Sequence, residues 1–124
     1  MRDFALADMA DDLLLLTLDM CDRDGKKPRT PKRLHRSLAD RIVLTACAIQ
    51  ETVILANETE LQTARAARAE YQAEAMRRCM VLKHQARILH ERGYISDKQR
   101  DHWQKLCVSV YWKIYAWAKS DSKR

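Results

Sequence analysis

The scarcity of glycine and proline most constrains what this chain can fold into. Its 124 residues contain two Gly and two Pro, and three of these four lie between residues 25 and 31. The remaining segments are long, uninterrupted and rich in Ala, Leu, Arg, Glu and Gln, which favour helices. A chain of this length can form one domain that buries about two-thirds of its unfolded surface without disulfides or metal. The sequence therefore predicts a single all-α domain.

Gly93 marks the clearest chain reversal. It can adopt the left-handed backbone conformation that closes a helix, and Ser96 with Gln99 forms a capping box that opens the next. Helical spacing after this turn aligns a core stripe of Trp103, Leu106, Cys107, Val110, Ile114 and Trp117. A second apolar face carries Val108, Tyr111, Trp112 and Tyr115. Trp and Tyr are enriched at interfaces and also stack on bases, so this face is expected to meet another subunit or a nucleobase, unless the helix is simply buried on both sides. We assign it to an oligomer interface.

Helices are predicted at about residues 2–21, 31–57, 60–92 and 97–120. Thr30 and Pro31 suit the start of the second, as N-cap and first helical residue. Thr59 and Gln62 can form a capping box for the third. Residues 121–124 are predicted to be a frayed basic tail. Four amphipathic helices with mostly short connections predict an antiparallel up-down four-helix bundle.

Charge is unevenly distributed along the chain. The formal net charge is +6, yet residues 1–22 carry six Asp and one Arg. An acidic first helix on a basic body suits a polyanion such as nucleic acid or an acidic lipid surface, although many basic domains bind neither. Solvated, solubilising charge is the plain alternative for every cation here. The predicted phosphate contacts are Arg29, Lys32, Arg33 and Arg36 near the second helix start, and Arg65, Arg77, Lys83 and Arg87 on the third helix.

Known catalytic patterns are missing from the sequence. Its four Cys lie far apart with no C-x-x-C pair, its four His show no i, i+4 pair or E-x-x-H motif, and it has no Gly-rich phosphate loop. The cysteines are expected to be buried thiols in a reducing cytoplasm. The N-terminus does not resemble a signal peptide, and the longest apolar run, Leu13 to Leu16, is too short to span a bilayer. The sequence therefore predicts a cytoplasmic, non-enzymatic binding protein without metal or cofactor.

Several short motifs occur in an order typical of one family. Leu55 to Thr59 reads Leu-Ala-Asn-Glu-Thr, Gly93 begins Gly-Tyr-Ile-Ser-x-x-Gln, and the chain closes on Trp117-x-Lys119-Ser120. With the acidic first helix and arginine-rich third helix, these motifs resemble the Avd accessory proteins of diversity-generating retroelements. More distantly, the chain is similar to four-helix-bundle proteins encoded in intervening sequences of bacterial 23S ribosomal RNA genes.

The resemblance implies a non-catalytic subunit. Avd proteins are four-helix bundles that form a homopentameric barrel, bind a reverse transcriptase and its template RNA, and support error-prone cDNA synthesis. By position, Asn57 matches the turn before the third helix, Gly93 and Ser96 the turn before the fourth, and Trp117 with Lys119 the C-terminal signature. The loop from Arg23 to Arg36 has no counterpart in these motifs, so its expected role depends on charge alone.

We therefore expect an accessory subunit that binds a reverse transcriptase and RNA, with DNA as a second nucleic acid. It is expected to assemble with copies of itself and to bind no membrane. The alternatives are a 23S ribosomal RNA intervening-sequence protein, a protein-only interaction module and an unrecognised metal-dependent bundle enzyme.

Overall fold

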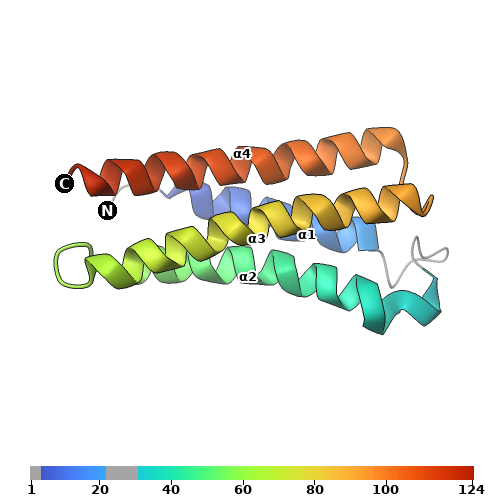
Figure 1. Cartoon of the computed structure of the whole chain (residues 1–124), viewed down its shortest axis with the longest axis horizontal. Helices are drawn as coiled ribbons and strands as arrows, with labels where there is room; N and C mark the ends of the chain where they lie inside the picture. Colours follow the sequence, from blue (N-terminus) through green and yellow to red (C-terminus); the bar gives the residue numbers. More distant parts are fainter. Residues whose placement is uncertain (1–3, 22–30) are drawn as a thin grey trace.

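A computed structural model describes residues 4–21 and 31–124 of the chain (Figure 1). Within these residues lie four α-helices: α1 (Ala5–Cys21), α2 (Asp40–Glu58), α3 (Arg65–Glu91) and α4 (Asp97–Ser122). Each helix runs antiparallel to the next, and α1 also packs against α4, which closes the bundle (Figure 1). No strand occurs in the described part of the chain. The predicted all-α fold and four-helix bundle are confirmed.

One buried stripe from each helix forms the core, at the helical spacing expected from the sequence. The stripe of α4 is buried at Trp103, Cys107, Val110 and Ile114. Trp103 is the largest fully buried side chain, and its indole Nε1 donates to Thr17 Oγ1 at 3.1 Å. The Thr17 hydroxyl donates in turn to the Leu13 carbonyl at 2.7 Å. A polar pair between α1 and α4 therefore lies within the apolar core.

Replacing Thr17 with valine tests this pair. Thr17→Val keeps the side-chain volume but leaves the buried Trp103 N–H without its acceptor, so the free energy of unfolding should decrease by about 1–3 kcal/mol. Thr52→Val is the matched control, because the half-buried Thr52 hydroxyl bonds only to backbone carbonyls of its own helix. Urea denaturation of both variants measures the difference. Equal losses would contradict a stabilising role for the indole contact.

The turn between α3 and α4 follows the local sequence signals. Gly93 has a positive φ of 79°, and the Tyr94 N–H donates to the Leu89 carbonyl at 3.0 Å, as in a glycine-terminated helix. Ser96 Oγ accepts from the Gln99 backbone N–H at 3.1 Å, and Gln99 Oε1 accepts from the Ser96 N–H at 2.8 Å. The predicted capping box is confirmed.

The predicted starts of the second and third helices need correction. Thr59 ends α2 instead of opening α3, because its N–H and its hydroxyl both donate to the Leu55 carbonyl of α2. As a result α3 begins at Arg65, not at residue 60. A 3-10 turn (Lys32–Leu34) and a π turn (His35–Ala39) precede α2, where a regular helix from residue 31 was predicted. Thr30, the expected N-cap, lies outside the described residues.

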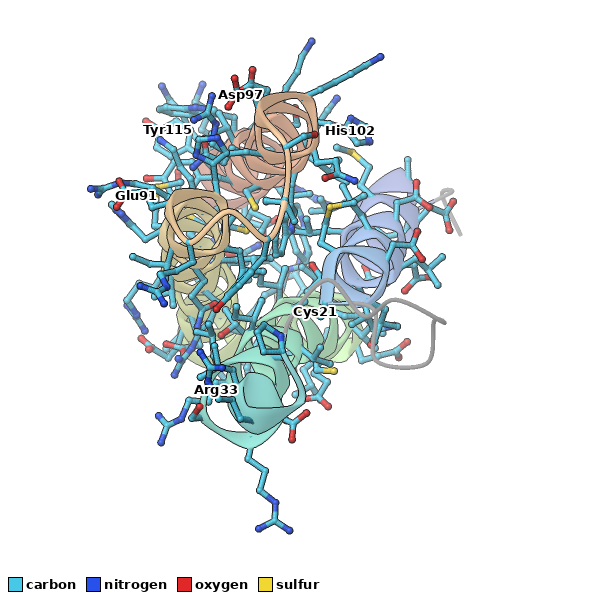
Figure 2. All side chains as sticks on the ribbon, turned by 90° about the vertical axis from the view of Figure 1, so that its right-hand side faces the viewer. Cys21, Arg33, Glu91, Asp97, His102 and Tyr115 are labelled. Carbon is cyan, nitrogen blue, oxygen red and sulfur yellow. The ribbon has the colours of Figure 1, made fainter. Side chains whose placement is uncertain are left out.

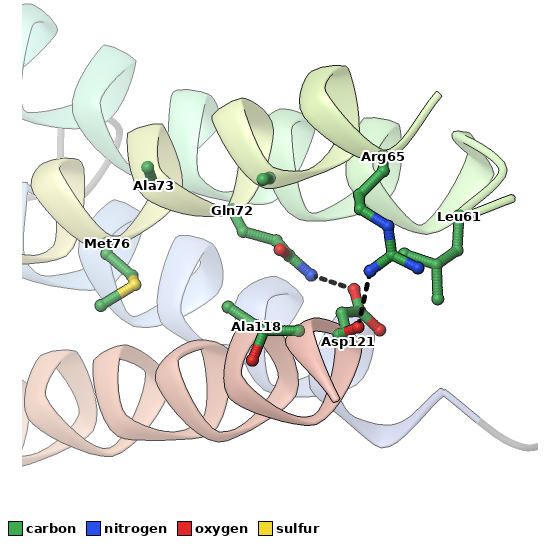
Figure 3. Close-up of a pocket in the computed structure, with 9 residues that line it drawn as sticks. Leu61, Arg65, Gln72, Ala73, Met76, Ala118 and Asp121 are labelled. Atoms are coloured by element: carbon green, nitrogen blue, oxygen red, sulfur yellow. Dashed lines mark hydrogen bonds between the residues drawn. The ribbon is translucent and has the colours of Figure 1, made fainter. Parts of the chain in front are cut away.

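The predicted frayed tail at residues 121–124 is wrong. Helix α4 continues to Ser122, and the Asp121 side chain is buried. Arg68 binds the Asp121 carboxylate with two nitrogens at 2.7 and 3.2 Å, and Gln72 Nε2 donates to it at 2.8 Å. Arg65 Nη1 donates to the Asp121 backbone carbonyl at 2.8 Å (Figure 3). These four residues, here called the C-terminal clasp, fasten the end of α4 to the beginning of α3.

Candidate nucleic-acid interface

The arginines predicted to contact phosphate on α3 are occupied within the protein. Arg65 belongs to the C-terminal clasp and reaches toward α4 (Figure 3). Arg77 Nη2 lies 2.8 Å from Glu70 and 2.9 Å from Glu74, and Arg87 Nε lies 3.1 Å from Glu91. These glutamates bind part of each guanidinium and offset the positive charge of Arg77 and Arg87. The outer face of α3 is therefore charged but largely neutralised.

The other predicted phosphate contacts are spread over separate parts of the bundle. Arg33 and Arg36 are exposed before α2, and Figure 2 places Arg33 across the bundle from α4. Lys83 is half-buried on α3. Arg29 and the side chain of Lys32 lie outside the described residues. The predicted cations that the structure describes therefore do not gather into one surface.

A more continuous basic surface lies on α4. Lys98, Lys105, Trp112 and Lys119 follow one another at intervals of seven residues, which places them along one face of the helix. All four are exposed, as is the neighbouring Tyr115. We call these five residues the α4 stripe. The sequence analysis identified the aromatic members of this stripe. It missed the interval of seven residues that aligns the lysines with Trp112, although that interval is readable in the sequence.

The aromatic part of the stripe stands in contact with solvent. Trp112 is 56% exposed and Tyr115 42% exposed, whereas Val108 and Tyr111 of the predicted oligomer interface are half-buried. The ring centroids of Trp112 and Tyr115 lie 5.3 Å apart in an edge-to-face arrangement. Lys119 Nζ lies 5.9 Å from the Tyr115 ring centroid. The stripe thus offers aromatic surface beside an ammonium group, the combination that single-stranded nucleic acids meet in binding grooves.

The acidic residues of α4 do not neutralise these lysines. Asp97 lies 2.5 Å from His90, Asp101 2.9 Å from Arg100, and Asp121 is held in the C-terminal clasp. The hydrogen bond from His90 lowers the pKa of Asp97, so this carboxylate is ionised at neutral pH and lies beside His90. None of the three stripe lysines forms an ion pair among residues 4–21 and 31–124. Uncompensated positive charge therefore lies on α4.

Burial suppresses the ionisation of two of the four cysteines. None of the four cysteines forms a disulfide. Burial raises the pKa of Cys79 to about 12 and also raises the pKa of Cys107, so both thiols are protonated at neutral pH. No group of three or more His, Cys, Asp or Glu side chains within residues 4–21 and 31–124 is arranged to hold a metal ion. In the same ranges, every helix is too short or too polar to cross a bilayer.

No protein-family model, curated protein or solved structure matches this chain. The resemblance of its motifs to Avd accessory proteins therefore stays a prediction.

Proposed function

We propose that this protein binds single-stranded RNA through the α4 stripe, by phosphate contacts to lysines and base stacking on Trp112 and Tyr115. The observation that carries the proposal is the set of free, exposed lysines in register with an exposed tryptophan. Aromatic stacking accepts every base, and ammonium groups contact the backbone at any sequence, so binding should show little sequence preference. The sequence assigned this aromatic face to a subunit contact, but the unpaired lysines beside it favour a polyanion.

The wider role that we propose is that of a non-catalytic accessory subunit of a diversity-generating retroelement. In this role the protein holds the template RNA, docks the reverse transcriptase and assembles with copies of itself, in the cytoplasm. The three motifs that carry the family resemblance fall at structural joints, and the first of them, Leu55 to Thr59, ends α2. Gly93 and Ser96 form the α3–α4 turn, and Trp117 packs on Phe4 of the chain's start, with ring centroids 5.0 Å apart. A neighbouring reverse-transcriptase gene would support this role, whereas a location inside a 23S ribosomal RNA gene would contradict it.

Alanine substitutions on the stripe test RNA binding. Removal of a stacking side chain typically costs about 1–3 kcal/mol per base, so Trp112→Ala and Tyr115→Ala should each weaken the affinity for a labelled single-stranded RNA about 5- to 150-fold. Fluorescence anisotropy at low ionic strength measures this affinity. Leu55→Ala is the control, because Leu55 is 45% exposed on α2, a different helix from the one that carries the stripe.

The outcomes separate three possibilities. Weaker binding by the two aromatic variants, with Leu55→Ala unchanged, supports the proposed site. Unchanged binding by all three variants would move the RNA site away from α4. If the wild-type protein binds no RNA at all, the nucleic-acid proposal fails and a protein-only interaction module becomes the better interpretation.

A further inference from the structure

Helix α1 presents an acidic, leucine-containing outer face. Leu15 is 59% exposed and Leu18 45% exposed, although leucine is normally a core residue. Asp8 and Asp12 are exposed on the same side, and neither forms an ion pair among the described residues. The described helix carries no Lys or Arg. We call Asp8, Asp12, Leu15 and Leu18 the α1 ridge.

A groove of the complementary character lies between α2 and α3. It has a volume of about 380 Å³, and its lining includes Thr45 and Ala48. Leu44 and Val81 also line it, with 66% and 40% of their surfaces exposed. Leu44 is the most exposed large apolar side chain among the described residues, so this site carries apolar surface that no described residue covers.

Arginines border the same groove. Arg41 on α2 and Arg78 on α3 both line it. Arg78 is bonded to Glu74 at 2.6 Å, whereas Arg41 forms no ion pair with any described residue. A segment that lies in the groove would therefore meet exposed aliphatic side chains flanked by positive charge. The segment that fits is an amphipathic helix with leucines and carboxylates on one face.

We propose that the α1 ridge of one copy docks into the α2–α3 groove of the next copy. The leucines meet Leu44 and Val81, and the aspartates approach Arg41, so the two surfaces match in apolar character and in charge. Alternative docking of the ridge on the α4 stripe would also pair acid with base, but the stripe lacks the exposed aliphatic walls of the groove. The inference builds on the self-association included in the proposed function and adds the surfaces that carry it.

This pairing joins two different surfaces and is therefore heterologous. The end-on view places α1 on the opposite side of the bundle from α3, so the ridge and the groove face different directions (Figure 2). One copy can use both surfaces at once, with a different neighbour at each. Repetition of such a contact produces a closed ring or an open filament, not a two-fold dimer.

Complementation between two variants tests the pairing. Leu15→Glu blocks the ridge and leaves the groove intact, whereas Leu44→Glu blocks the groove and leaves the ridge intact. Wild-type protein should be an oligomer by light scattering after size exclusion, and each variant alone should be a monomer. An equimolar mixture should form a species with twice the monomer mass, because one intact ridge and one intact groove remain. Ile54→Glu is the matched control: Ile54 is exposed on α2 but does not line the groove, so its oligomer mass should not change.

Several results would overturn the inference. Wild-type protein that is monomeric at all concentrations would do so, as would variants that stay oligomeric or a mixture that stays monomeric. Loss of the oligomer in Trp112→Ala but not in Leu44→Glu would move the contact to α4 and equally refute it. Leu18→Glu and Val81→Glu form a second pair in case either first variant misfolds. Measuring RNA binding by the same samples distinguishes failure of this interface from failure of the RNA-binding proposal. A wild-type monomer that binds RNA would contradict the interface and leave the RNA-binding proposal intact.

Discussion

Replacing Arg68 with alanine should lower the free energy of unfolding by about 3–5 kcal/mol, because one partner of a buried ion pair is removed while the other stays buried. Arg68 is 12% exposed and Asp121 7% exposed at the side chain, and their closest atoms are 2.7 Å apart. The Arg68 guanidinium also lies 5.0 Å from the Trp117 ring centroid and donates to the Thr59 carbonyl at 3.2 Å. One side chain therefore joins the α2–α3 turn to the end of α4.

The matched control for Arg68→Ala is Arg87→Ala. Arg87 bonds to Glu91 at 3.1 Å, and its side chain is 57% exposed. An exposed ion pair contributes about 0–1 kcal/mol, so this variant should unfold close to the wild-type midpoint. Chemical denaturation followed by circular dichroism compares them. Similar losses in both variants would show that the C-terminal clasp contributes no more than a surface ion pair.

The stabilisation by Arg68 should depend on pH, because its partner Asp121 is titratable. Burial by itself raises the pKa of Asp121, but hydrogen bonds from Arg68 and Gln72 and the charge of Arg68 outweigh it, and the net pKa lies below its ordinary value. A lowered folded-state pKa gives stability that is present above the unfolded pKa of about 4 and lost as pH falls through the folded pKa. The stability difference between wild type and Arg68→Ala should therefore be full at neutral pH and decrease below about pH 4. A constant difference down to pH 2 would indicate that ionisation of Asp121 is not involved.

Local sequence signals predicted the turns whose partners are close in sequence. Gly93 and the Ser96–Gln99 capping box need only adjacent residues, so the α3–α4 turn was predicted correctly. The box at Thr59 failed because the same residue can also end the helix before it, and its N–H and hydroxyl bond backward to Leu55. Spacing alone does not decide between these two uses of a threonine.

The choice between α3 and α4 as the candidate RNA-binding surface depends on contacts between side chains, some of them far apart in the sequence. Arg65 appeared free in the sequence because its partner, Asp121, is 56 residues away. The pairing of Arg77 with Glu74 was within reach of the sequence, since residues three apart are neighbours on a helix. A count of cations that ignores neighbouring glutamates therefore favoured α3 as a phosphate-binding surface. When the arginines that are paired with glutamates are left out, the exposed lysines of α4 form the more basic surface.

The affinity for single-stranded RNA should fall about 20-fold between 50 and 200 mM salt, because three phosphates neutralised by the stripe lysines give a slope of about −2 in log K against log salt. Lys98→Gln, Lys105→Gln and Lys119→Gln should each reduce this slope by about 0.7. Arg77→Gln and Arg87→Gln are the matched controls on α3, since their guanidiniums are already bonded to glutamates. Titration of labelled RNA at four salt concentrations gives each slope. A slope that responds to the arginine variants and not to the lysine variants would place the phosphate contacts on α3, one of the two places where the sequence predicts them. Because the lysines lie on one helix face and the arginines on another, the two sets of slopes decide which surface holds the RNA.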